Sequence, residues 1–369
     1  MSLAPWANDP TTMSGPRPDT LVQFLTPQGA PTAHGKAHGI NVQLARELYR
    51  DMVLARRFDA EAFALQRQGE LNLWLMSWGQ EAAQVGSIRA LRDSDMVFPS
   101  YREHAVGLCR GLSPAQLLTQ WRGCSHSGWD PATCRLHIYS LVLGTQTLHA
   151  TGYAAGAAME DTDEVVAVYL GDGATSQGDV NEAFNWAAAG SLPVLFFCQN
   201  NQFAISTPAS IQMGAPLHRR AEGFGLQTYH VDGNDVLAVH AVTSAAAEHI
   251  RAGHGPALIE AQTYRLGGHS TSDDPGRYRS ADEFKLYESR DPLSRLRILL
   301  ADHHTDAEFF DDLDAECDAF AEQVRSACAA IDDPRLDETF ENSYAEPHPL
   351  VDAEYAAFIA ASSTLDNEI

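Results

Sequence analysis

Residues 165–201, VVAVYLGDGATSQGDVNEAFNWAAAGSLPVLFFCQNN, carry the clearest indication of the fold. It contains two apolar runs, at 165–170 and 192–198, on either side of an alanine-rich helical segment. Such runs are typical of strands that are buried on both faces, and a helical crossover between them makes the strands parallel. Short apolar runs and helical stretches continue to alternate between about residues 75 and 265. We therefore predict an α/β fold with a mostly parallel sheet flanked by helices.

Polar side chains follow both strands of this unit. Asp172 lies between two glycines directly after the first strand, and Asn201 follows the second. Because the strands are parallel, both side chains are expected at the carboxyl edge of the sheet, where such folds bind ligands. The glycines, among them Gly173, let backbone N–H groups approach a ligand closely. The next helix is expected to begin near Asp179, with Glu182 as its capping-box partner.

Two nucleotide-binding loops are excluded by the residues of this stretch. The spacing from Gly173 to Gly178 matches a Walker A loop, but Asp179 stands where that loop needs a lysine. No G-x-G-x-x-G motif follows a strand, so a nicotinamide or flavin site of the Rossmann type has no anchor. The carboxylate of Asp172 and the amide of Asn201 instead favour a Mg²⁺ site, because Mg²⁺ prefers oxygen ligands and phosphates.

The composition limits the partners of the chain. Hydrophobic residues make up 44% of the 369 residues, the proportion of a globular protein with a buried core. The formal charge of −24 disfavours nucleic acid or an anionic membrane as a partner. The six cysteines form no CxxC pair, and no apolar run is long enough to span a membrane. We expect a cytoplasmic protein with reduced cysteines, and neither a nucleic-acid nor a membrane partner.

Three regions are predicted along the chain. Residues 1–40 hold six of the 18 prolines, which indicates an extended N-terminal arm that could pack on a neighbouring subunit. Apolar residues at helical spacing predict a long helix from Asn41 to Gly69, at the start of an α/β domain over residues 41–300. Residues 301–369 hold 19 of the 49 acidic residues and two of the 25 basic ones, and are expected to form an acidic helical C-terminal extension.

Further motifs resemble those of a known family. GDG, then twenty-six residues, then NN is similar to the motif of thiamine diphosphate enzymes. The surrounding blocks resemble the alpha subunit of the decarboxylating component of 2-oxo acid dehydrogenase complexes, most of all the branched-chain members. The resemblance covers about residues 40–300, and it implies the thiamine diphosphate-binding fold with thiamine diphosphate and Mg²⁺ as cofactors. The blocks are WGQEAA (78–83), VFPSYREH (97–104), AISTPAS (204–210), VDGNDV (231–236) and TYRLGGHSTSDDPGRYRS (263–280).

The resemblance implies roles for the residues around the GDG motif. Asp172, the amide of Asn201 and the backbone carbonyl of Phe203 would hold Mg²⁺. Tyr101 and Arg102 would bind diphosphate oxygens, a task that suits a guanidinium because its fork pairs two phosphate oxygens at once. The alternative for this arginine is a surface ion pair. The cofactor-binding set implied in this way is Tyr101, Arg102, Leu143, Asp172, Gly173, Ala174, Asn201 and His269.

The chain departs from the family pattern at two places near this motif. Gln199 stands where branched-chain relatives have an arginine, so diphosphate binding is expected to rest more on Arg102. Gln202 and Phe203 stand where the relatives have Gly-Tyr. The role implied for Phe203 is unaffected, because it needs only the backbone carbonyl.

The segment SLVLGTQ, residues 140–146, resembles one that lies under the cofactor. In some family members this segment encloses K⁺ with backbone carbonyls and with Thr and Gln side chains. The implied K⁺ ligands are Ser140, Val142, Thr145 and Gln146, and Leu143 would face the aminopyrimidine. The relatives carry a proline at the position of Val142. A Thr-Gln pair in a loop also serves ordinary hydrogen bonding to the backbone, so that alternative stays open.

The loop at 263–280 contains His269, which the resemblance places at the reacting centre as a catalytic residue that contacts cofactor and substrate. An imidazole suits protonation of carbonyl or carbanion intermediates, or orientation of the acyl acceptor. His137 stands where the family has a histidine near the substrate, and Ser100 is expected to shape the substrate pocket. The residues expected to order the loop are Arg265, Asp273, Tyr278 and Arg279, and Ser270 and Ser280 occupy the sites that are phosphorylated in mitochondrial relatives.

The implied activity is oxidative decarboxylation of a 2-oxo acid, with transfer of the acyl group to the lipoyl group of a dihydrolipoyl acyltransferase. In this subfamily the beta chain supplies the glutamate that activates the cofactor, so we expect an α₂β₂ heterotetramer with a beta subunit. STSDD and VDGNDV favour branched-chain substrates such as 3-methyl-2-oxobutanoate, with pyruvate as the alternative. An alternative of another class is a non-catalytic zinc-bound scaffold with the ligands Cys124, His126, Cys134 and His137, whose spacings are irregular for zinc.

Overall fold

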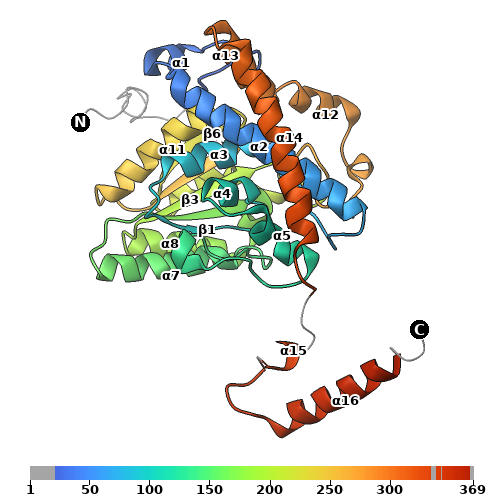
Figure 1. The fold of residues 1–369 in the computed structure, drawn as a ribbon. Coiled ribbons are helices and arrows are strands. Elements are labelled where there is room, and N and C mark those ends of the chain that lie inside the picture. The colour runs from blue at the N-terminus through green and yellow to red at the C-terminus, as the bar shows by residue number, and fades with distance from the viewer. Residues whose placement is uncertain (1–20, 334–337, 342, 366–369) are drawn as a thin grey trace.

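A sheet of five parallel strands forms the middle layer of the molecule, in the order β1-β2-β3-β7-β6 (Figure 1). The computed structural model describes residues 21–333, 338–341 and 343–365. All the pairings between neighbouring strands of this sheet are parallel, so the predicted fold class is confirmed. The strands are β1 (Met96–Phe98), β2 (Val166–Gly171), β3 (Val194–Asn200), β6 (Gln227–Asp232) and β7 (Ala257–Gln262).

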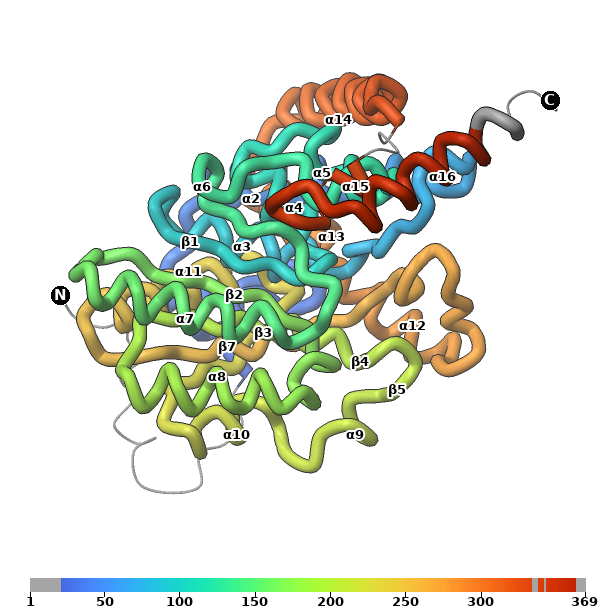
Figure 2. Tube along the Cα trace, turned by 90° about the horizontal axis from the view of Figure 1, so that it is seen from below, coloured from blue at the N-terminus to red at the C-terminus, as the bar shows by residue number. Residues whose placement is uncertain are grey.

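Helices cover both faces of the sheet (Figures 1 and 2). Successive side chains of a strand point to opposite faces. Val168 and Phe196 therefore pack with one helical layer, and Tyr169 and Phe197 pack with the other. The first layer consists of α7 (Thr145–Met159), α8 (Gly178–Ala189) and α10 (Leu217–Gly223). The second layer consists of α3 (Glu81–Ala90) and α11 (Val236–Arg251), with α2 (Val42–Arg67), α4 (His104–Cys109) and α5 (Pro114–Arg122) also packed there.

Helix α2 is the long helix that the sequence predicts between Asn41 and Gly69. The Asn41 side chain caps the helix by accepting a hydrogen bond from the Leu44 amide at 3.1 Å. Leu48 and Met52 lie on its buried face. Gly69 follows the helix end with a φ of 85°, a left-handed conformation that glycine adopts readily. Cap, apolar spacing and stop signal are all confirmed.

Helix α8 begins within one residue of the predicted Asp179, but without the predicted capping box. The helix begins at Gly178, and its N-cap, Gln177, makes no side-chain capping bond. Glu182 accepts a hydrogen bond from Asn185 at 3.2 Å instead of closing a capping box. Residues Asp172–Ser176 form a 3₁₀ helix, and the extended residue Gln177 that follows is the N-cap of α8. The third helical position, where a capping box needs Glu or Gln, is therefore Val180. The capping-box prediction was wrong.

Residues 21–40 pack on the chain's own sheet. Val22 forms a parallel bridge to β6, and Phe24 and Leu25 are buried. The backbone amides of these two residues donate to Asp235 Oδ2 at 2.7 and 2.6 Å. Helix α1 (Ala33–His38) follows. The described half of the predicted arm is thus part of the domain, and residues 1–20 lie outside the described residues.

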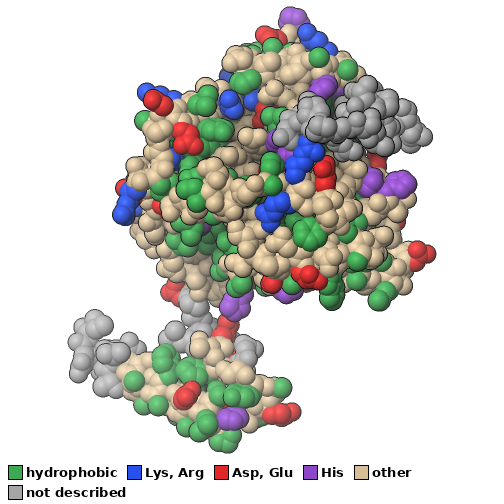
Figure 3. All heavy atoms as spheres, turned by 180° about the vertical axis from the view of Figure 1, so that it is seen from behind, with side chains coloured by type: hydrophobic (Ala, Val, Ile, Leu, Met, Phe, Trp, Pro, Cys, Tyr) green, Lys and Arg blue, Asp and Glu red, His purple; other side chains and the backbone are tan. Residues whose placement is uncertain are grey.

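The predicted boundary at residue 300 falls inside α13 (Pro292–Asp302). Helix α14 (Ala307–Ala329) lies along α2, and its acidic side chains pair with arginines, as in Arg57–Asp318 at 3.3 Å. The α15 and α16 helices stand apart from the sheet, and apolar side chains spread over the surface of α16 (Figures 1 and 3). The acidic region thus divides into a helix that packs on the domain and a separate helical pair, α15 (Glu338–Glu341) and α16 (Pro349–Leu365).

Short elements complete the described part of the chain. No described helix combines the length and the apolar character that crossing a membrane would take. The short elements are α6 (Pro131–Cys134), β4 (Phe203–Ala204), β5 (Thr207–Pro208), α9 (Ala209–Gln212), α12 (Ala281–Glu288) and a second 3₁₀ helix (Pro275–Arg277).

Candidate functional site

A cavity of about 160 Å³ lies at the carboxyl edge of the sheet, where β2 and β3 end. Its walls come from the loops after β1 and β7, the loop before α7, and the ends of β2 and β3. The parallel register brings these chain ends to one edge, as predicted for Asp172 and Asn201. Ten of the residues predicted to bind cofactor, Mg²⁺ or substrate line it: Ser100, Tyr101, Arg102, Leu143, Asp172, Gly173, Ala174, Asn201, Phe203 and His269.

Three oxygen-bearing groups meet in this cavity. The Asn201 side-chain amide lies 3.2 Å from Asp172 Oδ1 and 3.1 Å from the Phe203 carbonyl oxygen. Turned one way, the amide nitrogen donates to both oxygens. Turned the other way, the amide oxygen joins the two others and completes a donor set for a hard cation. Among the described residues, Asp172 Oδ2 has no hydrogen-bond partner although it is buried.

The electrostatics of Asp172 also fit a cation. Burial raises the pKa of Asp172 to about 6, and the backbone amide of Asn201 and the guanidinium of Arg265 offset only part of this effect. A buried carboxylate without a counter-charge is costly, and a divalent ion would supply that charge. The residues present therefore fit a Mg²⁺-type ion, with carboxylate, amide and carbonyl oxygens as ligands.

Local backbone geometry positions these groups. The Thr175 hydroxyl donates to the Asp172 carbonyl at 2.8 Å and closes the 3₁₀ turn after β2. Gln202, between Asn201 and Phe203, adopts a φ of 75°, in the left-handed region. A side chain costs about 1–2 kcal/mol in that conformation, whereas glycine adopts it freely. This accounts for the glycine that the family resemblance implies at this position.

Arg102 joins the cavity to the His269 loop. Its guanidinium donates to the carbonyl of Met76 and, at 3.0 Å, to the carbonyl of His269. The guanidinium carbon lies 5.4 Å from the centroid of the Tyr101 ring. Arg102 is only 5% exposed, and it forms no ion pair within the described part of the chain. The alternative of a surface ion pair was therefore wrong.

His269 is neutral at physiological pH. Burial, followed by the neighbouring guanidinium groups of Arg102 and Arg265, lowers the pKa of His269 to about 4, although Asp273 acts in the opposite direction. The Arg102 guanidinium lies 3.4 Å from His269 Nδ1 and can only donate, so Nδ1 accepts and the proton resides on Nε2. The imidazole therefore retains one N–H that can donate to a ligand.

The His269 loop is held by the four side chains that the sequence predicts for this task. Asp273 Oδ2 accepts from the His269 amide at 2.6 Å and from the Tyr278 hydroxyl at 2.5 Å. Arg265 donates to the Tyr278 hydroxyl at 2.7 Å, and Arg279 donates to the Arg265 carbonyl at 2.6 Å. The network fixes the backbone on both sides of His269.

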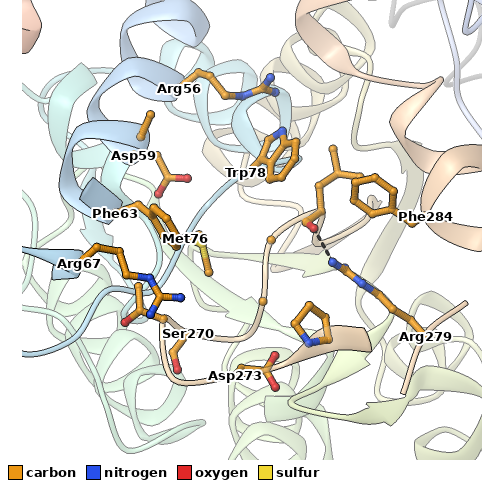
Figure 4. Close-up of a pocket in the computed structure, with 16 residues that line it drawn as sticks. Arg56, Asp59, Phe63, Arg67, Met76, Trp78, Ser270, Asp273, Arg279 and Phe284 are labelled. Carbon is orange, nitrogen blue, oxygen red and sulfur yellow. Dashed lines mark hydrogen bonds between the residues drawn. The ribbon is translucent and has the colours of Figure 1, made fainter. Parts of the chain in front are cut away.

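A second cavity, of about 550 Å³, lies beside the same loop (Figure 4). Figure 4 shows Arg56 and Asp59 on one side of it and Ser270 and Asp273 on the other. His269 lines the first cavity, whereas the flanking residues Gly268 and Ser270 line the second. The loop is thus a shared wall that presents different residues to the two cavities.

The dehydrogenase E1 component family model matches residues 49–332. The chain belongs to this family. A 3-methyl-2-oxobutanoate dehydrogenase subunit alpha from Mycobacterium tuberculosis is 46% identical over 339 residues, 90% of this chain and 92% of that protein. A pyruvate dehydrogenase E1 component subunit alpha from Acholeplasma laidlawii is 34% identical over 316 residues, 84% of this chain and 91% of that protein. A mitochondrial 2-oxoisovalerate dehydrogenase subunit alpha from Homo sapiens is 39% identical over 265 residues, 69% of this chain and 60% of that protein. Membership of the family implies thiamine diphosphate as the cofactor.

Some predicted residues of this dehydrogenase E1 chain lie outside the cavity at the carboxyl edge of the sheet. His137 lines a different cavity, where its ring stacks on Phe98 with centroids 4.8 Å apart. The structure does not bring it to His269, so a catalytic role for His137 stays a prediction.

Within the described residues, no group of three or more His, Cys, Asp or Glu side chains could hold a metal ion, so nothing supports the zinc-scaffold alternative.

The proposed K⁺ ligands of the E1 chain lie in the turn that leads into α7. The Ser140 hydroxyl donates to the Val142 carbonyl at 3.1 Å, and the Thr145 amide points to the same carbonyl at 3.3 Å. Gln146 Oε1 accepts from the Gly144 amide at 3.0 Å. These bonds match the alternative of ordinary backbone hydrogen bonding, and a K⁺ ion would compete with them.

Two polar residues of the cavity have no role in the sequence prediction. Gln80 Oε1 lies 3.1 Å from the Asn201 side-chain nitrogen, and Gln80 Nε2 has no partner among the described residues. Glu103 also lines the cavity and is buried. Both belong to quoted family blocks, WGQEAA and VFPSYREH, but only their burial beside Asp172 and Arg102 marks them as members of the site.

Proposed function

We propose that this chain is the alpha subunit of a 2-oxo acid dehydrogenase that acts on branched-chain substrates such as 3-methyl-2-oxobutanoate. The observation that carries the proposal is the oxygen cluster of Asp172, Asn201 and Phe203 beside Arg102, in a chain of the E1 family. The relative with 46% identity carries the branched-chain name, and the pyruvate-named relative has 34%. Pyruvate dehydrogenase is therefore the second candidate.

Mg²⁺ would be held by Asp172, the Asn201 amide oxygen and the Phe203 carbonyl, with diphosphate oxygens completing its shell. Ser140, Val142, Thr145 and Gln146 remain the proposed ligands of a K⁺ ion. When bound, thiamine diphosphate supplies the electron sink that makes decarboxylation of a 2-oxo acid feasible. The acyl group would then pass to the lipoyl group of a dihydrolipoyl acyltransferase.

The chain's own residues would bind and orient in this reaction. Arg102 and Tyr101 lie on the same wall as Asp172 and would receive the diphosphate. The N–H on His269 Nε2 would donate to the substrate carbonyl or carboxylate, while its neutral ring avoids a fixed positive charge. Ser100 and Leu143 line the same cavity and would limit the space beside the reacting groups.

Completion of the site by a beta subunit is supported by apolar side chains at the cavity. Val142 is 72% exposed and Ile205 is 55% exposed, and Ile205 lines the cavity. Side chains of this kind at the edge of a polar site are suited to burial against a partner.

We also propose a cytoplasmic location, which the six free cysteines support.

Co-expression with the beta chain tests the assembly. We expect an α₂β₂ heterotetramer by size-exclusion chromatography with light scattering, and we expect Val142→Asp to reduce the recovered complex at least about tenfold by placing a charge in the interface. Met159→Asp is the matched control, because Met159 is 87% exposed at the other end of α7. Equal loss with both variants, or no loss with Val142→Asp, would argue against an interface at this edge.

Substrate preference is tested with the assembled enzyme. We expect kcat/KM for 3-methyl-2-oxobutanoate to exceed that for pyruvate by about 10–100-fold, since two additional methyl groups in an apolar pocket contribute about that much discrimination. The measurement is the reductive acylation of a separate lipoyl domain, which mass spectrometry detects as an increase in the mass of the domain. A higher kcat/KM for pyruvate would favour the second candidate.

A further inference from the structure

Glu103 is a buried carboxylate that lines the cofactor cavity without a role so far. It is 1% exposed and lies at the N-cap of α4, next to Arg102. Its Oε1 accepts a hydrogen bond from Gln199 Nε2 at 2.6 Å. Its Oε2 is buried and has no hydrogen-bond partner among the described residues. A carboxylate oxygen in that state is costly unless it carries a proton or meets a ligand.

A network of neutral amides fixes which oxygen of Glu103 remains available. Gln84 Oε1 accepts from the Ala105 amide at 3.1 Å, so its nitrogen must be the donor to the Gln199 side-chain oxygen, also at 3.1 Å. Gln199 therefore directs its own nitrogen at Glu103 Oε1. Oε1 is committed as an acceptor, and only Oε2 is left to face a ligand.

The groups around Glu103 supply little positive charge. Arg102 is the nearby cation, but its guanidinium donates to the carbonyls of Met76 and His269. The neighbouring imidazole of His104 is neutral, because burial lowers its pKa to about 3. Ser100 lies close to Glu103, whereas the Tyr139 hydroxyl pairs with His104 Nδ1 and the Tyr169 hydroxyl pairs with the Ser87 hydroxyl. Burial raises the pKa values of both tyrosines.

These surroundings bring Glu103 closer to protonation. Burial raises the pKa of Glu103, and the nearby Ser100, the hydrogen bond from Gln199 and the charge of Arg102 counter only part of that effect. A diphosphate in the same cavity would add negative charge close to the carboxyl group and raise its pKa further. An ionised Glu103 would also present an acceptor to phosphate oxygens, which are themselves acceptors.

We propose that Glu103 binds the cofactor's diphosphate as a neutral carboxylic acid, so that cofactor binding takes up a proton at this residue. This inference rests on the proposed function. A proton from solvent adds to Oε2, no other bond is made or broken, and the new O–H donates to a diphosphate oxygen. Glu103 thereby becomes a hydrogen-bond donor on the same wall as Arg102, and the cavity with bound cofactor carries one negative charge fewer.

Calorimetry of the assembled enzyme measures this proton directly. Thiamine diphosphate is titrated at saturating Mg²⁺ in buffers that differ in ionisation enthalpy, between about pH 6.5 and 8.5, and the slope of the observed enthalpy gives the protons taken up. We expect wild type to exceed Glu103→Gln by close to one proton per site at the pH of largest uptake. The glutamine retains a donor in place of the O–H, so Glu103→Gln should bind with an affinity that depends less on pH than wild type.

The control variant is Asp59→Asn. Asp59 is also a buried carboxylate with a pKa raised by burial, to about 6, but it lines the second cavity. Its amide variant should keep the wild-type proton uptake. If Glu103→Gln fails to fold, the test uses wild type alone. Infrared difference spectra recorded on addition of cofactor should then show a new band of a protonated carboxyl group.

The outcomes separate this inference from the proposed function. Equal proton uptake by wild type and Glu103→Gln over the whole pH range would overturn it, as would cofactor addition to wild type without a new protonated-carboxyl band. Much tighter binding by Glu103→Gln with unchanged proton uptake would mean that Glu103 only repels the cofactor, which also overturns it. Absence of any thiamine diphosphate binding by wild type would instead contradict the proposed function.

Discussion

Replacing Asp172 by alanine will abolish Mg²⁺-dependent binding of thiamine diphosphate by the assembled enzyme. Asp172 supplies the carboxylate of the oxygen cluster, and its Oδ2 has no other partner among the described residues. Changes to residues that merely support a metal ligand cost about 10–100-fold in affinity, so loss of the ligand itself should exceed about 100-fold. Fluorescence titration of the wild-type and variant heterotetramers with cofactor at fixed Mg²⁺ measures the effect.

The isosteric variant Asp172→Asn separates a lost ligand from a damaged fold. The pKa of Asp172 in the folded chain is raised to about 6 from an ordinary 3.8, so the folded state binds its proton more tightly than the unfolded state. The free energy of unfolding of the cofactor-free chain therefore falls as pH rises through about 6, by up to about 3 kcal/mol, and shows no such effect below pH 4, where both states are protonated. Asp172→Asn avoids this loss, so it should melt at a higher temperature than wild type at pH 8 and still fail to bind cofactor.

The same pKa gives the pH dependence of metal binding. Mg²⁺ needs the ionised carboxylate, so the affinity of wild type for Mg²⁺ and cofactor should weaken as pH falls through about 6. Cofactor affinity of Asp172→Ala within about threefold of wild type would refute the metal assignment.

The sequence predicts the sheet and most of the cavity for a simple physical reason. The apolar runs that form β2 and β3 are buried on both faces, and the crossover helix between them leaves only a parallel pairing. That pairing alone places Asp172 and Asn201 at one edge. The His269 loop follows β7, the next neighbour in the sheet, so it arrives at the same edge.

Features that depend on tertiary contacts could not be predicted from the sequence. Glu103 can be recognised as a site residue only from the structure, where α4 and β3 bury it and leave one of its oxygens without a hydrogen-bond partner among the described residues. The predicted capping box of α8 was wrong because Gln177, not Asp179, is the N-cap, so Glu182 lies beyond the position that a capping box needs. The acidic residues of α14 were expected in a separate region, yet Asp318 pairs with Arg57 of α2, because charge composition does not reveal partners far away in the chain.

Replacing His269 by alanine should leave cofactor binding intact and remove most turnover. The imidazole offers the N–H on its Nε2 to the cavity, and proton donation by such a group contributes about 10²–10⁴-fold to a rate. The loop itself should persist, because Arg102 bonds to the carbonyl of residue 269 and Asp273 to its amide, and both bonds use the backbone. We therefore expect kcat to fall by about 10²–10⁴-fold while the Kd for thiamine diphosphate stays within about threefold.

The variant His269→Gln distinguishes proton donation from packing. A glutamine can place an N–H close to the position of Nε2 but does not titrate, so it should restore part of the turnover that alanine loses if hydrogen-bond donation is the role. The pH profile gives a second readout. Because the pKa of His269 is lowered to about 4, the ring is neutral from pH 5 to 8. The kcat/KM of wild type should therefore not fall near pH 6.5 through protonation of His269. Wild type and His269→Gln should have the same pH dependence in this range. Turnover of His269→Ala within about tenfold of wild type, measured with a saturating lipoyl domain, would make the residue a bystander in the reaction.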